Sequence, residues 1–230
     1  MWLGDAALAQ DVGERREDML RTINDYAESV PIETVRQDGL DKDVLEAMRA
    51  VPRHEFVPEG MREHAYADRP LPIGHGQTIS QPFIVALMSH LLKVEAGDKV
   101  LELGTGSGYQ AAVLAEMGLQ VASIEIIPEL AEDAAADLER AGYGDVATRT
   151  GDGYYGWPER APFDGIVVTA AASHIPPPLV RQLKPGAHMV IPVGSPFAAQ
   201  QLVLVEKLPD GGTRTRQLLP VRFVPLTGDH

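Results

Sequence analysis

The spacing of apolar residues predicts helices in the first part of the chain. Residues 14–29 and 41–51 carry apolar side chains at helical spacing, and Pro52 after the second segment is a typical stop signal. The apolar faces are formed by Met19, Leu20, Ile23, Tyr26 and Ala27 in the first helix, and by Val44, Leu45, Met48 and Val51 in the second. Residues 52–82 show no period and are rich in Pro, Gly and His, which predicts a long loop that is either functional or disordered. A short apolar helix over residues 83–92 follows, with Pro82 in its first turn.

From residue 98 onward, short apolar runs alternate with helical segments. The predicted strands are 99–103, 120–126, 146–150, 163–169, 188–193, 201–207 and one within 217–224, and the predicted helices are 109–117, 128–141 and 177–183. This alternation predicts a parallel sheet with helices on both faces. The turn at residues 209–212 joins the last two strands without a helix, which predicts a hairpin.

The pattern therefore predicts an α/β fold: a doubly wound, mostly parallel, seven-stranded Rossmann-like sheet. An antiparallel C-terminal strand pair and N-terminal helices complete it. We expect a partly helical extension over residues 1–30. Residues 31–95 form a helical and loop segment, which makes one compact domain with the core of residues 96–230.

Composition excludes several classes of function. The net charge of -13, from 33 acidic and 20 basic side chains, argues against nonspecific nucleic-acid binding. The chain has no cysteine and no His-Glu-x-x-His pattern, so we expect no disulfide and no metal site. No apolar run approaches the length of a membrane span. Residues 7–9 (Ala-Leu-Ala) resemble a signal-peptidase site but lack a basic start and a long apolar stretch, so we expect a cytoplasmic protein, with export as the alternative.

A glycine loop between the first predicted core strand and its helix indicates a nucleotide-type cofactor. The loop reads Glu102-x-Gly104-x-Gly106-x-Gly108, and Glu125 ends the next strand, where its carboxylate can accept hydrogen bonds from ribose hydroxyls. The third glycine comes one residue earlier than in a dinucleotide loop. A carboxylate at position 102 repels a pyrophosphate but suits a cationic ligand with an amino group. The spacing thus favours S-adenosylmethionine over NAD; a ligand-free strand–helix turn is the remaining alternative.

Two further segments fall at positions suited to a ligand. Asp152 follows the third predicted core strand and can accept a hydrogen bond from the adenine amino group, unless it is simply a turn residue. Upstream of the glycine loop, residues 74–83 form a polar loop that bears hydroxyl groups.

With these residues in place, the chain resembles the protein-L-isoaspartate O-methyltransferase family over residues 51–227. The resemblance rests on residues 51–58, 76–82, the glycine loop, 151–153, 161–164, 168–171 and 222–227. It implies methyl transfer from S-adenosylmethionine to the free carboxylate of isoaspartyl residues in damaged proteins and peptides, with S-adenosylhomocysteine as product. Repair then proceeds through a succinimide. Residues 1–30 look longer than this family needs.

The resemblance also implies roles for individual residues. Ser80 lies beside the transferred methyl group and the substrate carboxylate. The residues that flank or line the substrate are Ile79, Ser80, Gln81, Ala170 and Ala171. The residues that bind the cofactor are Thr78, Glu102, Gly104, Thr105, Gly106, Ser107, Gly108, Glu125, Ile126, Asp152, Gly153, Thr169 and Thr227.

Methylation of a carboxylate does not require a strongly basic or nucleophilic side chain. An acceptor carboxylate is already ionised at neutral pH, so methylation needs orientation and not a strong base. Ser80 can donate a hydrogen bond that orients the carboxylate, although a serine before Gln-Pro is also a typical helix N-cap. His75 is either a positive charge near the substrate or a solvated loop residue. Arg222 either pairs with an acidic substrate tail or forms a surface ion pair.

Three other functions remain open from the sequence: a methyltransferase of the same fold with a dedicated peptide or small-molecule acceptor, a cofactor-binding scaffold without activity, and an NAD oxidoreductase. A repair enzyme must accept many unrelated proteins. We therefore expect a shallow groove beside Ser80 with few side-chain pockets. We also expect no membrane or nucleic-acid partner, and a monomer.

Overall fold

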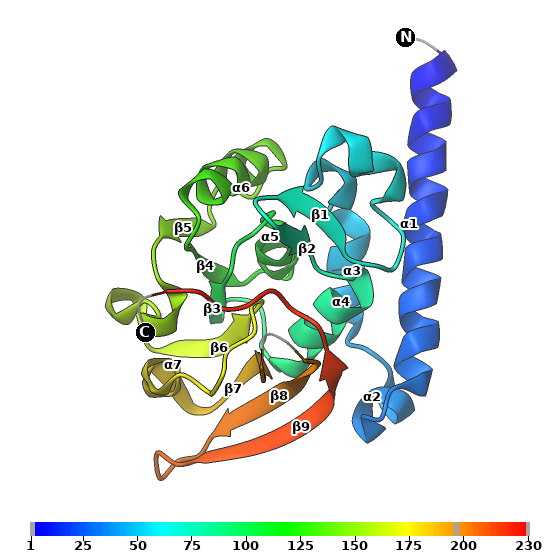
Figure 1. Ribbon diagram of the computed structural model, residues 1–230. Coiled ribbons are helices and arrows are strands. Elements are labelled where there is room, and N and C mark those ends of the chain that lie inside the picture. Colours follow the sequence, from blue (N-terminus) through cyan, green and yellow to red (C-terminus); the bar gives the residue numbers. More distant parts are fainter. Residues whose placement is uncertain (1–2, 196–197, 229–230) are drawn as a thin grey trace.

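The computed structural model describes residues 3–195 and 198–228, and it describes the side chains from residue 11 onward (Figure 1). The α-helices are α1 (Leu3–Ser29), α2 (Glu33–Asp38), α3 (Lys42–Ala50), α4 (Pro82–Leu91), α5 (Tyr109–Glu116), α6 (Pro128–Arg140) and α7 (Pro177–Gln182). The 3-10 helices are η1 (Arg53–Glu55), η2 (Glu59–His64), η3 (Gly153–Tyr155) and η4 (Pro158–Arg160). The strands are β1 (Leu71–Gly74), β2 (Gln77–Ile79), β3 (Lys99–Leu103), β4 (Gln120–Glu125), β5 (Ala147–Thr150), β6 (Phe163–Val168), β7 (Leu183–Val193), β8 (Gln200–Lys207) and β9 (Thr213–Val221).

The main sheet has seven strands in the order β5-β4-β3-β6-β7-β8-β9, which confirms the predicted fold. β3, β4, β5, β6 and β7 are parallel, while β8 runs antiparallel to both β7 and β9. The chain proceeds outward from β3 to β5 and then returns to β6 on the other side of β3. This reversal of direction leaves a crevice at the carboxyl ends of β3 and β6, where ligands bind in such sheets.

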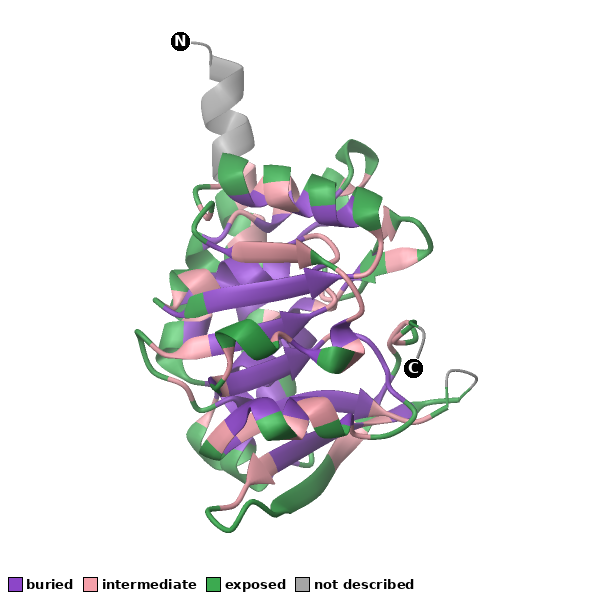
Figure 2. Cartoon of the chain, turned by 90° about the vertical axis from the view of Figure 1, so that its left-hand side faces the viewer, coloured by how far each residue is buried: buried purple, intermediate pink, exposed green. Residues whose placement is uncertain are grey.

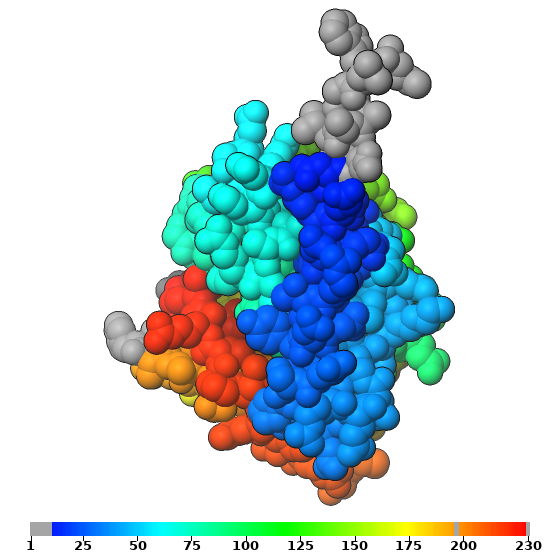
Figure 3. All heavy atoms as spheres, turned by 90° about the vertical axis from the view of Figure 1, so that its right-hand side faces the viewer, coloured from blue at the N-terminus to red at the C-terminus, as the bar shows by residue number. Residues whose placement is uncertain are grey.

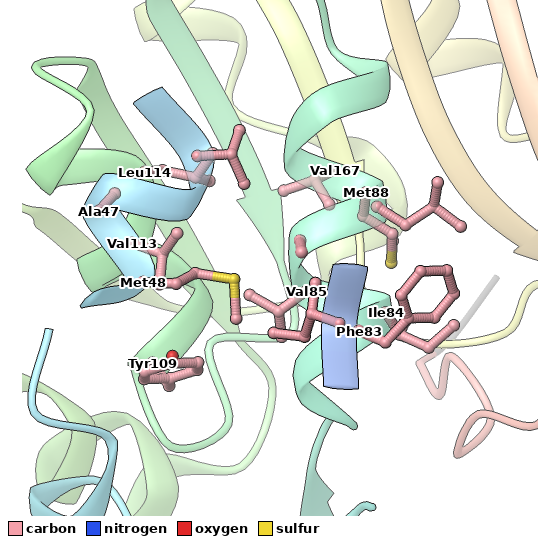
Figure 4. Packing of buried hydrophobic residues seen from close by; sticks show 14 of the residues in the cluster. Ala47, Met48, Phe83, Ile84, Val85, Met88, Tyr109, Val113, Leu114 and Val167 are labelled. Carbon is pink, nitrogen blue, oxygen red and sulfur yellow. The ribbon is translucent and has the colours of Figure 1, made fainter. Parts of the chain in front are cut away.

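Alternating residues of the central strands enter two separate cores, as the period of two requires. Val100 of β3 and Val167 of β6 pack against the N-terminal helices and α4 and α5. Figure 4 shows Val167 among residues of α3, α4 and α5. Leu101 and Ile166, on the opposite face, pack into the core that contains Leu179 of α7. Figure 2 shows the buried residues concentrated along the central strands between the two helical layers.

The N-terminal helix is longer than its sequence pattern predicts. It begins at Leu3 instead of residue 14 and runs along the edge of the molecule (Figure 1). Met19, Ile23 and Ala27 are buried as predicted, but Tyr26 is 47% exposed, so its expected place in the core is wrong. Seven residues are about two helical turns, so Tyr26 lies near the same face as Met19, but at the margin of the buried stripe, where it borders a groove beside Phe83. Residues 7–9 resemble a signal-peptidase site, and the structure does not describe their side chains.

The segment predicted as one long loop is partly regular. Residues 52–82 contain η1, η2 and a small hairpin formed by β1 and β2. The hairpin turn places Gly74, His75 and Gly76 at positive φ. Strands of four and three residues are too short to show a period, so the pattern could not reveal them.

The predicted boundaries differ elsewhere in small ways. α2 has no counterpart among the predicted helices, β7 begins at Leu183 instead of residue 188, and β9 begins at Thr213 and ends at Val221. The predicted hairpin turn is confirmed, since the Leu208 N–H donates to the Gly212 carbonyl (2.8 Å) between two antiparallel strands. Among the described residues, no helix is long and apolar enough to cross a membrane.

Candidate active site

A pocket opens in the crevice between the carboxyl ends of β3 and β6. Its floor consists of the loops that follow β3, β4 and β6, and the C-terminal segment (residues 222–228) crosses over these strand ends (Figure 1). The residues predicted for the site that line this pocket are Thr78, Ile79, Ser80, Glu102, Gly104, Thr105, Gly106, Ser107, Glu125, Ile126, Gly153, Thr169, Ala170 and Thr227. Segments far apart in the sequence thus converge on one cavity.

Four predicted site residues lie just outside this lining. Gly108 is the N-cap of α5, and the Asp152 carboxylate accepts the Tyr154 N–H (2.9 Å). Gln81 lines the neighbouring groove, and its side-chain amide donates to Asp68 (2.7 Å). Ala171 is buried, and its backbone pairs with the C-terminal segment. All four lie next to the pocket, and each takes part in a cap, a hydrogen bond or a backbone pairing within the protein.

The three glycines of the loop are required by the backbone. Gly104, Gly106 and Gly108 all have positive φ, at 90°, 52° and 84°. A Cβ on Gly104 would also lie 2.6 Å from the Thr169 hydroxyl oxygen, which is far too close. Gly104 is therefore required both by its positive φ and by its close approach to Thr169 at the end of β3.

Glu102 is the most perturbed acid of the site. It is fully buried, and burial raises its pKa to about 8. One carboxylate oxygen, Oε2, accepts a hydrogen bond from Ser123, whose oxygen lies 2.6 Å from the Thr105 hydroxyl. The other oxygen, Oε1, has no hydrogen-bond partner among the described residues. A buried acceptor without a partner is costly, so a donor or cation supplied by a ligand would be bound strongly there.

Glu125 has a more structural role than its sequence position suggests. Its carboxylate accepts backbone N–H groups from Gly106 (2.8 Å), Ile126 (2.9 Å) and Ile127 (3.1 Å). A carboxylate offers about four acceptor positions. Glu125 thus fixes the glycine loop to the end of β4 and keeps room for roughly one further donor, such as a ribose hydroxyl.

Ser80 does not cap the helix that follows it, which removes the structural alternative for this residue. The N-cap of α4 is Gln81, with Pro82 in the first turn, and neither Ser80 nor Gln81 makes a side-chain cap bond. Asp68 performs the capping instead, since its carboxylate accepts the Phe83 N–H (2.8 Å). No hydrogen bond within the described chain occupies the Ser80 hydroxyl, which is therefore available to a ligand.

Arg53 supports the Ser80 loop from its buried side. It lies within residues 51–58, which carry part of the resemblance, but the sequence analysis assigns it no role. Its guanidinium is fully buried and donates to the backbone carbonyls of Ser80 (2.6 Å) and Ala65 (2.8 Å). It also lies 4.6 Å from the ring centre of Tyr109, the first residue of α5. Arg53 therefore connects the Ser80 loop to the helix that starts at the glycine loop. Its partner Ser80 lies 27 residues away, so no local pattern could reveal the contact.

The C-terminal segment closes the pocket from above. The Ala171 N–H donates to the Val224 carbonyl and the Leu226 N–H donates to the Ala171 carbonyl, each at 2.8 Å. Val224, Pro225 and Leu226 consequently join Thr227 in the pocket wall. The sequence predicts Thr227 but not its three neighbours, whose position depends on this pairing across the molecule.

The two basic candidates, His75 and Arg222, occupy different surroundings. His75 is exposed in the β1–β2 turn and lines neither the pocket nor the groove beside it, which agrees with a solvated loop residue. Arg222 lines the groove, and it forms no ion pair with any described residue, so the surface ion-pair alternative is wrong.

The residues of the pocket fit S-adenosylmethionine. The unpartnered Glu102 oxygen can receive an amino group, the glycine loop gives access to backbone close to the ligand, and Glu125 retains acceptor capacity. A buried carboxylate directly at the loop would oppose a pyrophosphate. The site therefore favours the cationic cofactor over a dinucleotide.

Comparison with known proteins gives the same answer. The family model for protein-L-isoaspartate(D-aspartate) O-methyltransferase (PCMT) matches residues 27–230. The protein-L-isoaspartate O-methyltransferase 2 of Syntrophobacter fumaroxidans is 61% identical over 232 residues, which cover 100% of this chain and 94% of that protein.

Solved structures agree at the level of the fold. A protein-L-isoaspartate O-methyltransferase aligns with a TM-score of 0.81 at 29% identity, covering 93% of this chain and 66% of that one. A chain described as such a methyltransferase from Plasmodium falciparum, in complex with S-adenosyl-L-homocysteine, aligns with a TM-score of 0.72 at 26% identity, covering 85% of this chain and 95% of that one. The resemblance seen in the sequence is thereby confirmed. The chain belongs to the protein-L-isoaspartate(D-aspartate) O-methyltransferase family, whose members are S-adenosylmethionine-dependent O-methyltransferases.

Proposed function

We propose that this chain methylates the free α-carboxylate of isoaspartyl residues in damaged proteins and peptides. The observation that carries this proposal is the meeting of two cavities at Ser80. The cofactor pocket and a neighbouring groove share Thr78, Ser80, Thr169 and Val224. A peptide in the groove can therefore present a carboxylate to a cofactor in the pocket.

Ser80 orients the acceptor in this proposal. Its unengaged hydroxyl donates a hydrogen bond to one carboxylate oxygen and leaves the other free to react. Arg53 fixes the backbone of Ser80 through its carbonyl (2.6 Å), so the hydroxyl is held in place from the buried side. Holding the reacting atoms in line supplies much of the acceleration of such a transfer.

The remaining chemistry requires no strong base. When bound, S-adenosylmethionine supplies an electrophilic methyl group, which the carboxylate oxygen takes to give a methyl ester and S-adenosylhomocysteine. The ester carbonyl is then open to the following backbone amide, which displaces methanol and closes a succinimide. Hydrolysis of the succinimide yields some normal aspartate, and the steps after methylation are spontaneous.

A matched peptide pair tests the proposal. The two peptides share a sequence and differ in carrying isoaspartate or aspartate at one position, and methyl transfer from labelled S-adenosylmethionine is measured. We expect kcat/KM to be about 100-fold or more higher for the isoaspartyl peptide, because a displaced carboxylate cannot reach both Ser80 and the cofactor. Cofactor binding without transfer to either peptide, or equal transfer to both, would contradict the proposal.

Further aspects of the function remain proposals. We propose that the chain acts as a monomer in the cytoplasm, with export as the alternative, and that nucleic acid is not a partner. The net charge of -13 supports the last point, since nucleic-acid binding needs a basic surface. We also propose that the predicted site residues bind the cofactor and the substrate as the sequence analysis assigns them.

A further inference from the structure

The groove beside Ser80 is larger than an opening for a carboxylate alone. Its volume is about 470 Å³, and it extends from Ser80 outward between α1, α4 and β9. Cavities of this size are typical of sites that receive a substantial part of a ligand. The sequence analysis expects a shallow groove with few side-chain pockets, whereas the volume of this groove leaves room for a side chain of the substrate.

The walls of this groove are predominantly apolar. Tyr26 comes from α1, Phe83 from α4, Leu219 from β9 and Phe223 from the C-terminal segment. Among the described residues that line the groove, Arg222 is the only one with a charge. Figure 3 shows α1 in blue and the C-terminal residues in red side by side on this face. Such a lining favours an apolar side chain over a polar or charged one.

Tyr26 gives the groove an aromatic wall from just before the segment that the family model matches. It precedes residues 27–230, which that model matches. Tyr26 is 47% exposed, and its ring lies 5.5 Å from the Phe83 ring, centre to centre, at a tilt of 32°. An aromatic pair with one accessible ring can receive a further apolar group against it.

We propose that this groove binds the apolar side chain of a residue adjacent to the isoaspartate, and that Tyr26 together with Phe83 sets this preference. The proposal rests on the proposed function, because the groove reaches the reacting carboxylate through Ser80. An extended peptide advances about 3.3 Å per residue, so a residue next to the isoaspartate falls within the groove. Tyr26 is thus a specificity-determining residue supplied by the N-terminal helix.

A peptide series tests this inference. Isoaspartyl peptides carry Gly, Asn, Leu or Phe immediately before or immediately after the isoaspartate. For the unaltered protein we expect kcat/KM to be about 10-fold higher with Leu or Phe than with Gly at one of these positions, mainly through a lower KM, as burying one apolar side chain predicts. Asn, which is close to Leu in size, should give no such gain.

Variants identify the wall that is responsible. Tyr26→Ala should reduce the Leu-to-Gly ratio to about 3-fold or less, while Tyr26→Phe should retain it. Tyr155→Ala is the matched control, since Tyr155 is 50% exposed and lies outside the groove, and it should keep the unaltered ratio. Equal kcat/KM for Gly, Leu and Phe at both positions, or an unchanged ratio in Tyr26→Ala, overturns the inference. Failure to methylate any isoaspartyl peptide would instead overturn the proposed function.

Discussion

Replacing Gly104 with alanine should weaken cofactor binding by about 100-fold or more and destabilise the fold. At φ 90° an alanine is strained, and its Cβ would meet the Thr169 hydroxyl oxygen at 2.6 Å. That hydroxyl has one hydrogen to donate and lies within hydrogen-bond distance of the carbonyls of Leu103 (2.9 Å) and Gly104 (2.6 Å), so moving it away breaks a hydrogen bond. Backbone strain, the steric conflict and the lost hydrogen bond together amount to roughly 3–5 kcal/mol. Tm should fall by about 10 °C, at some 2–4 °C per kcal/mol for a chain of this size.

Gly186→Ala is the control that distinguishes backbone strain from steric conflict. Gly186 has a similar φ of 82°, but a Cβ at this position would have no atom within 4 Å, and the residue is not part of the pocket. Gly186→Ala should therefore lower stability by only about 1–2 kcal/mol and leave affinity for S-adenosylhomocysteine unchanged. Titration calorimetry and thermal unfolding measure both quantities. Unaltered affinity and Tm in Gly104→Ala would show that the glycine loop is not shaped as described.

The second large effect is that of Glu102→Gln, which should increase stability and weaken cofactor binding. Burial raises the pKa of Glu102 to about 8 in the folded protein, against an ordinary value of 4.5. Below pH 4.5 both folded and unfolded chains hold the proton. As pH rises from 4.5 to 8, the unfolded chain loses its proton first, so the folded state loses stability. Glu102→Gln removes this penalty and should raise Tm by about 5–10 °C at pH 7.5, but not at pH 4.5.

The same substitution should impair the cofactor site. A cationic amino group favours the ionised carboxylate, so affinity for S-adenosylmethionine should increase with pH, by up to about tenfold per unit, and level off near pH 8. Glu102→Gln should bind the cofactor about 10–100-fold more weakly at pH 8 and lose this pH dependence. Glu132→Gln, at an exposed acid beyond the first turn of α6, serves as the control and should change neither quantity. A destabilised Glu102→Gln protein, or one with unaltered affinity, would contradict this role.

The sequence predicts those parts of the site that depend on local structure. The glycine loop follows a strand and opens a helix, and Glu125 ends the next strand, so their proximity follows from parallel pairing of β3 and β4. Short apolar runs likewise predict the central strands β3, β4 and β6, because these are buried on both faces, whereas the edge strands β5 and β9 are largely unburied. The pattern of residues 74–83 indicates only a polar, hydroxyl-bearing loop, and the role of Ser80 within it comes from the resemblance.

The contacts that the sequence could not reveal join segments distant in the chain. Asp68 caps α4 from 15 residues away, and Arg53 reaches the Ser80 carbonyl from 27 residues away. The C-terminal segment closes the pocket through Ala171, and Tyr26 faces a groove bordered by β9. Each of these depends on tertiary packing, which overrides the local preference of the residues involved. Tyr26 shows the difference most clearly, because helical spacing alone predicts it in the core.

The most direct test of Ser80 as the residue that orients the acceptor is to compare turnover and cofactor affinity in Ser80→Ala. The Ser80 hydroxyl has no hydrogen-bond partner among the described residues, so its removal should leave both stability and the Kd for S-adenosylhomocysteine unchanged. We expect kcat for an isoaspartyl peptide to fall by about 10–100-fold, the value of one hydrogen bond to a charged group, and Ser80→Thr to restore part of it. Unaltered turnover in Ser80→Ala, or a loss of cofactor affinity equal to the loss of activity, would contradict this assignment.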